Sequence, residues 1–198
     1  METAALDGRN GVRDLISAEQ IQSRVAELAE EINEDFEDVD LLFMIIILRG
    51  GCFFGTDLAK RLRVPVRLDY IRVTTYSGTQ STGVVSMVSD IKTDIRGKRV
   101  LLVDDIVDTG FTMEWILRYL ELKQPGVVRV AALLDKPARR EFDVHIDYLG
   151  FTVPNVFVAG YGLDGLDDTM ANIPRVIAVH DTDEQVTVPP RRARLPTL

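Results

Sequence analysis

The chain has 198 residues, 46% of them hydrophobic, which is enough for a single domain with a sizeable core. Its formal net charge of -8 argues against nucleic acid as a partner, because nucleic acid attracts basic proteins. Since the chain has one cysteine, no signal-peptide pattern and no apolar run near the roughly 20 residues that span a bilayer, we expect a cytoplasmic protein without a membrane partner.

The N-terminal third predicts a helix followed by a buried strand. Residues 1–15 mix glycine, asparagine and charge without periodicity, so we expect a flexible segment. Ser17 followed by Gln20 is typical of a capping box, and apolar residues at helical spacing predict a helix over residues 21–36. Residues 41–48 are apolar at every position, as in a central strand of a parallel sheet covered on both faces.

A second helix and a hairpin are predicted next. Residues 53–62 read as a crossover helix, and residues 66–73 as a strand with alternating polarity. The polar loop 74–83 separates this strand from the apolar residues 84–88. We therefore expect a long-looped antiparallel hairpin.

The middle of the chain shows the element order of a doubly wound fold. We predict a strand, a turn, a helix and a strand over residues 99–105, 105–112, 113–123 and 127–134. Short strands and loops follow. The sequence thus predicts an α/β domain over residues 16–180, with a mainly parallel sheet flanked by helices and a small hood subdomain. We expect residues 181–198 to be a flexible C-terminal tail.

The turn after the predicted strand 99–105, the second strand expected to be buried on both faces, carries the strongest chemical signal. Asp104 and Asp105 end an apolar strand, where open α/β sheets bind ligands, and adjacent carboxylates can accept hydrogen bonds from ribose hydroxyls. Gly110 allows close approach of the backbone. Free amides and the helix dipole favour a phosphate beside Thr109 and Thr112. The sequence therefore predicts a site for a sugar phosphate.

Two other interpretations of this turn stay open. Paired aspartates at the end of a strand often do no more than cap the following helix. A phospho-acceptor receiver domain also has paired aspartates after an apolar strand, but there they follow the first strand, whereas here they follow a much later one.

Residues 100–112, VLLVDDIVDTGFT, resemble the signature with which type I phosphoribosyltransferases bind phosphoribosyl pyrophosphate (PRPP). Other segments resemble the hypoxanthine-guanine branch of that family, namely residues 48–59, 75–83, 133–140 and 150–164. The resemblance extends over about residues 15–180. It implies a purine-salvage enzyme that joins hypoxanthine or guanine to PRPP and releases pyrophosphate.

The resemblance also implies which residues bind PRPP. The ribose and 5′-phosphate are assigned to Asp104, Asp105, Asp108, Thr109, Gly110, Phe111 and Thr112. Asp108 is in addition implied to be the general base that accepts the proton from N7 of the purine. Pyrophosphate is assigned to Arg49, Gly50 and Gly51, where the family often has a cis peptide bond, here Leu48–Arg49. Without the resemblance, two glycines after a strand also fit an ordinary turn.

Magnesium is the cofactor that the resemblance implies. Its carboxylate ligands would be Asp104, Asp105 and Asp164, directly or through water. Taken alone, Asp164 would be interpreted as a turn residue.

The purine site is implied in the same way. Lys136 would donate to the oxygen at position 6, Phe157 would stack on the base, and Val158 would read its edge with backbone groups, beside Asp164. Other interpretations are that Lys136 is an ordinary solvated lysine and that Phe157 belongs to the core.

Two further segments relate to catalysis. Thr75, Tyr76 and the loop that follows resemble a hood that closes over the site and excludes water, although their composition also fits a plain hairpin loop. The family has an arginine about six residues after the aspartate that aligns with Asp164, whereas this chain has Met170. A pyrophosphate contact is then missing unless Arg175 replaces it.

Two alternative functions remain open on the same fold. One is a non-catalytic regulator that senses PRPP and binds RNA, against which the net charge of -8 argues. The other is a phosphoribosyltransferase that prefers xanthine. The resemblance implies PRPP and a 6-oxopurine as small-molecule partners, and a homodimer or homotetramer.

Overall fold

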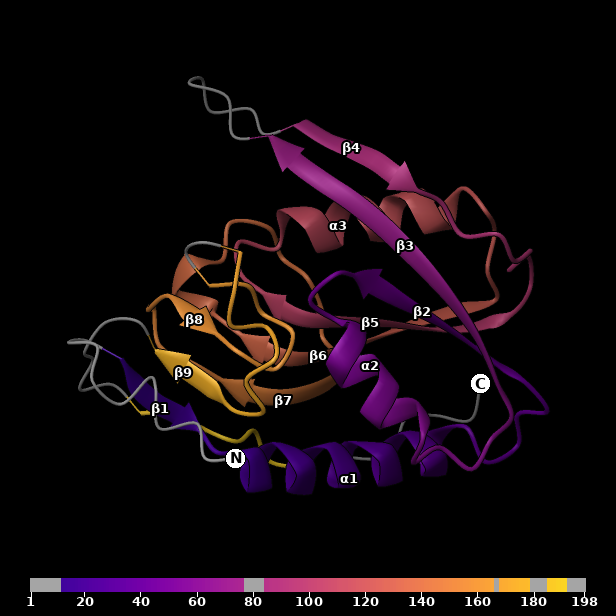
Figure 1. Ribbon diagram of the computed structural model, residues 1–198. Helices are drawn as coiled ribbons and strands as arrows, with labels where there is room; N and C mark the ends of the chain where they lie inside the picture. Colours follow the sequence, from indigo (N-terminus) through magenta and orange to yellow (C-terminus); the bar gives the residue numbers. More distant parts are fainter. Residues whose placement is uncertain (1–11, 77–83, 166–167, 179–184, 192–198) are drawn as a thin grey trace.

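The computed structural model describes residues 12–76, 84–165, 168–178 and 185–191 (Figure 1). The helices are α1 (Ala18–Asp35), α2 (Cys52–Ala59), α3 (Phe111–Glu121) and the short 3-10 helix η1 (Pro137–Arg139). The strands are β1 (Arg13–Ile16), β2 (Leu42–Leu48), β3 (Val66–Tyr76), β4 (Val84–Ser89), β5 (Arg99–Val107), β6 (Val127–Asp135), β7 (Tyr148–Thr152), β8 (Val158–Ala159) and β9 (Val176–Ala178). In the described part of the chain, no helix is long and apolar enough to cross a membrane.

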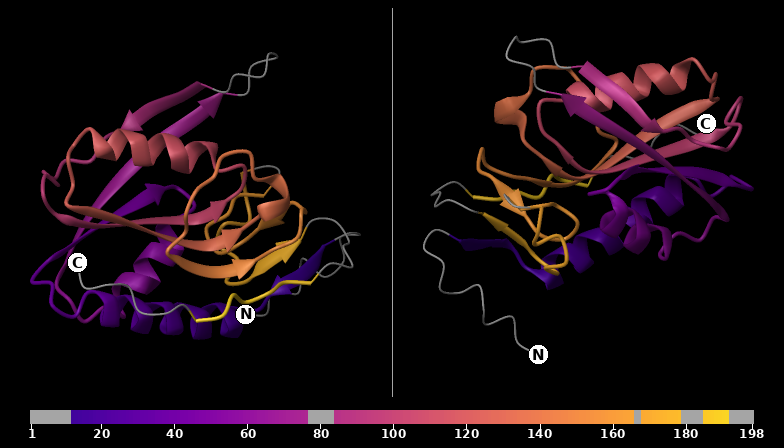
Figure 2. Two further views of the ribbon diagram at one scale, coloured as in Figure 1. Left: turned by 180° about the vertical axis from the view of Figure 1, so that it is seen from behind. Right: turned by 45° about the horizontal axis from the view of Figure 1, so that its top comes forward.

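The main sheet confirms the predicted fold class. Its six strands lie in the order β4-β3-β2-β5-β6-β7, and all neighbours are parallel except β3 and β4. Helix α3 covers one face, and α1 and α2 lie on the other (Figures 1 and 2). A smaller sheet in the order β1-β9-β8 lies beside the carboxyl end of this sheet.

Strand β2 shows why both faces must be covered. Its first six residues are buried, as its unbroken apolar sequence predicts. Because side chains alternate along a strand, Met44 and Ile46 pack in the core with α1 and α2, while Ile45 and Ile47 pack in the core with α3. The carboxyl end of β2 thus lies in the middle of the molecule, with a helical layer on either side.

Helix α1 begins at the predicted capping box. The Ser17 hydroxyl accepts a hydrogen bond from the Gln20 amide at 3.2 Å, and the Gln20 side chain accepts one from the Ser17 amide at 2.8 Å. Ile21, Val25 and Leu28 are buried on one face of the helix, as their spacing predicts.

Ser17→Ala should lower the free energy of unfolding by about 1 kcal/mol, because it removes the acceptor of an otherwise unpaired helix amide. Urea unfolding followed by circular dichroism measures the change. Ser23→Ala is the matched control, since Ser23 is exposed inside the same helix and alanine has the higher helix propensity. Equal stability of the two variants would contradict a stabilising role for the box.

The hairpin is present as predicted, with β3 and β4 antiparallel. It extends away from the body of the domain at the upper side of Figure 1. The predicted loop 74–83 was wrong for its first three residues, because β3 continues to Tyr76 in its pairing with β4. Thr75 and Tyr76 are therefore the last two residues of β3, and residues 77–83 lie outside the described residues.

The two predicted flexible ends are more ordered than expected. Residues 13–15, assigned to a flexible segment, belong to β1, which pairs with β9 near the other end of the chain. Thr187, in the predicted flexible tail, exchanges backbone hydrogen bonds with Thr152 at the edge strand β7, and Arg191 pairs with Glu34 at 2.6 Å. Both predictions were wrong for these residues because their partners are remote in the sequence.

Candidate active site

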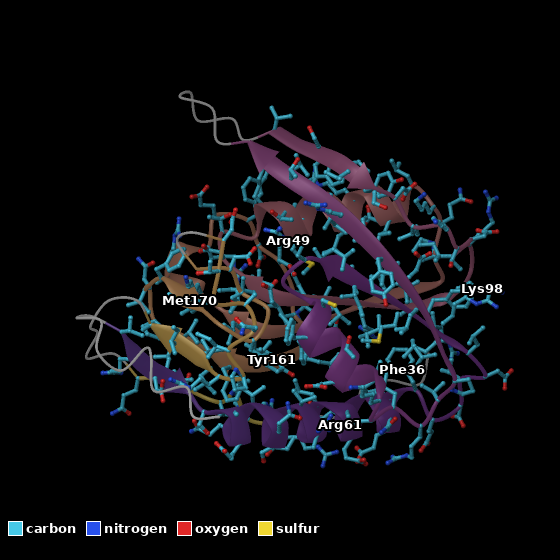
Figure 3. The ribbon with its side chains drawn as sticks, in the orientation of Figure 1. Phe36, Arg49, Arg61, Lys98, Tyr161 and Met170 are labelled. Carbon is cyan, nitrogen blue, oxygen red and sulfur yellow. The ribbon has the colours of Figure 1, made fainter. Side chains whose placement is uncertain are left out.

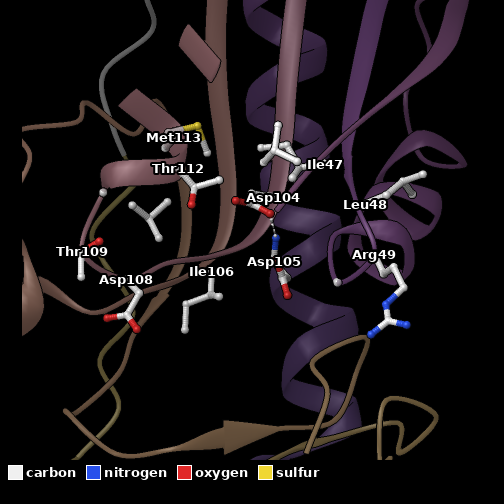
Figure 4. Close-up of a pocket in the computed structure, with 14 residues that line it drawn as sticks. Ile47, Leu48, Arg49, Asp104, Asp105, Ile106, Asp108, Thr109, Thr112 and Met113 are labelled. Atoms are coloured by element: carbon white, nitrogen blue, oxygen red, sulfur yellow. Dashed lines mark hydrogen bonds between the residues drawn. The ribbon is translucent and has the colours of Figure 1, made fainter. Parts of the chain in front are cut away.

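A pocket of about 270 Å³ opens at the carboxyl ends of β2 and β5. Figure 4 shows Asp104 and Asp105 between Arg49 on one side and Asp108 with Thr109 on the other. The pocket is lined by eight of the residues predicted to bind PRPP, namely Arg49, Gly50, Asp104, Asp105, Asp108, Thr109, Gly110 and Thr112. Segments that are distant in the sequence therefore meet at one edge of the sheet, as the motif predicts.

The paired aspartates lie within strand β5, which extends to Val107 rather than ending at Asp105 as predicted. Asp104 is only 6% exposed, and its carboxylate accepts a hydrogen bond from the amide of Asp105 at 3.0 Å. Burial raises the pKa of Asp104 well above its usual value, and the negative charge of Asp105 adds to this. Burial likewise raises the pKa of Asp105. Such a pair is suited to hydroxyl donors or a cation that enters the pocket.

The turn between β5 and α3 is built for close contact with an anion. Gly110 is the N-cap of α3 with φ of 87°, and a Cβ there would lie 2.6 Å from the carbonyl oxygen of Phe142. Gly110 offers no side-chain acceptor to the helix, and the Phe111 amide donates to the Thr109 hydroxyl at 3.3 Å. The amides that follow Phe111 in the first turn are then the ones available to a ligand. Thr109 and Thr112 line the same space.

The loop after β2 approaches β5 so closely that it requires glycine. The Leu48–Arg49 peptide bond is cis, as the resemblance implies. A Cβ on Gly50 would lie 1.8 Å from a carboxylate oxygen of Asp105, and a Cβ on Gly51 would lie 2.7 Å from the carbonyl of Ile47. The guanidinium of Arg49 pairs with Asp164 at 2.7 Å. An ordinary surface turn would not need this fit.

A second pocket of about 320 Å³ adjoins the first. It is lined by the predicted purine residues Lys136, Phe157, Val158 and Asp164, together with Ile106, Asp108, Arg139, Asn155, Val156 and Leu163. Phe157 is 37% exposed and so is not a core residue. The predicted purine residues come from the segment that follows β6 and from the segment around β8, and the structure brings them together in this pocket.

Lys136 is not a solvated lysine, because it is only 5% exposed. Burial lowers the pKa of Lys136, while the negative charge of Asp108 opposes this effect. A buried ammonium at a pocket wall can donate to a ligand oxygen with little competition from water.

Asp108 belongs to both pockets. Its Oδ2 accepts a hydrogen bond from Arg139 at 2.9 Å. Its Oδ1 is buried and has no hydrogen-bond partner among the described residues. An acceptor without a partner is costly in a folded protein, so this oxygen is a candidate for contact with a ligand. Arg139 and Asn155 also line the second pocket, although no motif in the sequence points to them.

The segment after β8 connects the two pockets. Gly162 has φ of 101°, and a Cβ there would lie 2.2 Å from the carbonyl oxygen of Gly50. The Tyr161 hydroxyl donates to Asp57 of α2 at 2.8 Å, and the ring of Tyr161 packs edge-on against Phe53. This packing holds Asp164 within reach of Arg49.

Gly162→Ala should destabilise the protein more than Gly97→Ala, by on the order of 1 kcal/mol. Gly97 has φ of 66°, inside the left-handed region that other residues adopt at moderate cost, and nothing lies within 4 Å of a Cβ there. Gly162 has φ of 101°, outside that region, so its variant carries both the larger conformational cost and the clash with Gly50. Thermal and urea unfolding compare the two. Equal losses would mean that the backbone around Gly162 relaxes freely.

Met170 and Arg175 do not line either pocket. Met170 packs beside Ala159, Ile173 and Ile177, and Figure 3 shows it on the side of the three-stranded sheet. Arg175 pairs with Asp14 of β1. The structure therefore gives no support to Arg175 as a substitute for the missing arginine.

The predicted magnesium ligands do not form a complete protein site. No three His, Cys, Asp or Glu side chains of the described ranges gather in a metal-binding cluster, and Asp164 instead pairs with Arg49. Mg²⁺ commonly uses one or two carboxylates, several waters and the phosphates of a substrate. The acidic pair and Asp164 fit that kind of site, in which the substrate supplies further oxygens.

Similarity to known proteins shows the class of enzyme to which the chain belongs. Residues 14–165 match the family model of the phosphoribosyl transferase domain. The chain is 45% identical over 157 residues to the hypoxanthine-guanine phosphoribosyltransferase of Mycobacterium avium, which covers 76% of this chain and 77% of that protein. It is 43% identical over 164 residues to the hypoxanthine-guanine-xanthine phosphoribosyltransferase of Tritrichomonas foetus, covering 82% and 88%.

Solved structures agree with the sequence comparisons. The hypoxanthine phosphoribosyltransferase of Trypanosoma cruzi, in complex with the product IMP, matches with a TM-score of 0.78 and 35% identity over 84% of this chain and 93% of that one. That of Staphylococcus aureus matches with a TM-score of 0.83 and 32% identity over 91% and 96%. The chain belongs to the hypoxanthine-guanine phosphoribosyltransferase family of the type I phosphoribosyltransferases.

Proposed function

We propose that this protein is a purine-salvage enzyme that transfers the phosphoribosyl group of PRPP to N9 of hypoxanthine or guanine and releases pyrophosphate. The relatives named above support this reaction. The observation that carries it is the position of Asp108, which lines both the acidic sugar-phosphate pocket and the pocket of Lys136. A group placed there can act on the bond that joins a ribose to a base.

In this proposal the first pocket holds PRPP. Residues 108–112, which form the turn after β5 and the start of α3, bind the 5′-phosphate. Phe111 does not itself line the pocket. Asp104 and Asp105 accept hydrogen bonds from the ribose hydroxyls. Arg49 and the amides of Gly50 and Gly51 bind pyrophosphate on the other side of the acidic pair. PRPP would then span the pocket from α3 to the loop after β2.

Asp104, Asp105 and Asp164 are the carboxylates that would hold Mg²⁺ with the substrate. When bound, the metal supplies positive charge that stabilises the pyrophosphate leaving group. Burial raises the pKa values of Asp104 and Asp105, and a bound cation would favour their charged forms.

The second pocket would hold the purine. Lys136 donates to the oxygen at position 6, Phe157 stacks on the ring, and the backbone at Val158 reads the base edge near Asp164. An adenine has no oxygen at position 6, so the buried ammonium favours oxopurines.

Cleavage of the bond between C1′ and the pyrophosphate oxygen leaves positive charge on the ribose and negative charge on pyrophosphate. N9 of the purine forms the new bond to C1′, and the proton on N7 moves to Oδ1 of Asp108, the oxygen without a partner. Arg49 and the loop amides stabilise the leaving group. The hairpin end at Thr75 and Tyr76 would close over the pocket and exclude water.

Pyrophosphate release from PRPP and Mg²⁺, measured with hypoxanthine, guanine, xanthine, adenine and uracil, tests this function. We expect turnover with hypoxanthine or guanine and none with uracil or adenine. The name of the Tritrichomonas foetus relative makes xanthine the informative third base. No turnover with any oxopurine, together with salt-dependent RNA binding, would instead support a regulator. The predicted homodimer or homotetramer is a separate proposal, which light scattering tests.

A further inference from the structure

Arg139 contacts the one carboxylate that lines both pockets, and the reaction proposed above does not use it. Its Nη1 donates to Oδ2 of Asp108 at 2.9 Å. Arg139 also lines the purine pocket with Lys136. The ion pair therefore lies inside the proposed site rather than at its margin.

Backbone hydrogen bonds join the segment that contains Asp108 to the segment that contains Arg139. On one side, the Lys136 amide donates to the carbonyl of Val107 at 3.0 Å, and on the other the Glu141 amide donates to the carbonyl of Thr109 at 2.9 Å. These residues flank Asp108 on the turn after β5 and flank Arg139 on the segment after β6. The two backbones thus hold Asp108 and Arg139 close to each other.

Stability does not account for the contact. The Arg139 and Asp108 side chains are 48% and 36% exposed, and ion pairs at such exposure add little to folding. The geometry has a clearer effect on the carboxylate itself. With Oδ2 held by Arg139, Oδ1 is the buried oxygen left without a partner in the described part of the chain.

We propose that Arg139 is a positioning residue of the reaction: it holds Asp108 so that Oδ1 faces N7 of the purine. This inference rests on the proposed function. In the step concerned, the N7–H bond breaks and an Oδ1–H bond forms, while Oδ2 stays on the guanidinium and Arg139 keeps its own protons. The other charged groups that line this pocket are Lys136 and, in the segment after β8, Asp164.

Arg139→Gln should lower kcat for hypoxanthine by on the order of 10²-fold, because the base loses its fixed orientation. KM for PRPP and the melting temperature should stay at their wild-type values. Arg63→Gln is the control, since Arg63 forms an exposed ion pair with Glu30 outside both pockets, and its kcat should not change. Arg139→Lys should recover part of the lost kcat.

A double variant separates positioning from a direct contact with substrate. If Arg139 acts only through Asp108, then Arg139→Gln combined with Asp108→Asn should have the kcat of Asp108→Asn alone. Multiplicative losses, or full kcat in Arg139→Gln, would overturn the inference. A wild-type protein without transferase activity would overturn the proposed function itself, and the wild-type assay distinguishes that result from failure of the role of Arg139.

Discussion

Asp108→Asn should lower kcat for hypoxanthine by roughly 10²- to 10⁴-fold, the range for loss of a general base. Asparagine keeps the shape of the side chain and can still accept a hydrogen bond from Arg139, but it cannot accept a proton at the position of Oδ1. PRPP should still bind, because Asp104, Asp105 and the amides of the α3 turn remain. Steady-state kinetics with calorimetric titration of PRPP measures both effects.

Asp38→Asn is the control for this experiment, since Asp38 is exposed and lines neither pocket. It should have wild-type kcat. Turnover by Asp108→Asn within a few-fold of wild type would remove Asp108 from the role of base. Loss of PRPP binding in the same variant would assign Asp108 to the sugar rather than to the purine.

Lys136→Met should weaken hypoxanthine binding by roughly 1.5–3 kcal/mol, which is about a 10- to 150-fold rise in the dissociation constant. Methionine keeps an unbranched apolar stem that is one atom shorter, but a ligand oxygen loses a charged donor that is 5% exposed. PRPP binding should stay intact. Hypoxanthine titrated into the protein with PRPP analogue and Mg²⁺ measures the loss, and Lys92→Met, at an exposed lysine outside both pockets, serves as the control.

The free energy of unfolding should not fall in Lys136→Met, although hypoxanthine binding is weakened. Because burial lowers the pKa of Lys136, the native protein holds that proton less tightly than the unfolded chain does. The unfolded state then binds more protons just below the usual value of 10.5, and wild-type stability rises with pH in that window. Lys136→Met should lack that rise and should be no less stable at neutral pH. Reduced stability with unchanged hypoxanthine affinity would indicate a structural lysine instead.

Much of the fold could be predicted because its signals are local. The capping box at Ser17 and Gln20 depends on neighbours three residues apart, and the double-sided burial of β2 follows from its own unbroken apolar run. The same holds for the turn before α3, because its glycine, Gly110, and its aspartates, Asp104, Asp105 and Asp108, lie in one short segment of the sequence. Such signals need no knowledge of the rest of the chain.

The unpredicted features are long-range contacts. Strand β1 has four residues and is stabilised by pairing with β9. Arg139 was visible in the sequence as one of two adjacent arginines, but its partner Asp108 is 31 residues away. Only the parallel pairing of β5 with β6 brings the ends of these strands together. A pattern of residue types within one segment carries no information on that distance.

The backbone contact between Thr187 and Thr152 covers part of an open sheet edge. An open edge strand exposes unpaired amides and carbonyls that can recruit strands from other chains, which promotes aggregation. Strand β7 is such an edge, and Thr187 occupies the amide and carbonyl of its last residue, Thr152. A recombinant form that ends before residue 185 would uncover this edge, whereas an affinity tag placed after residue 191 would leave it covered.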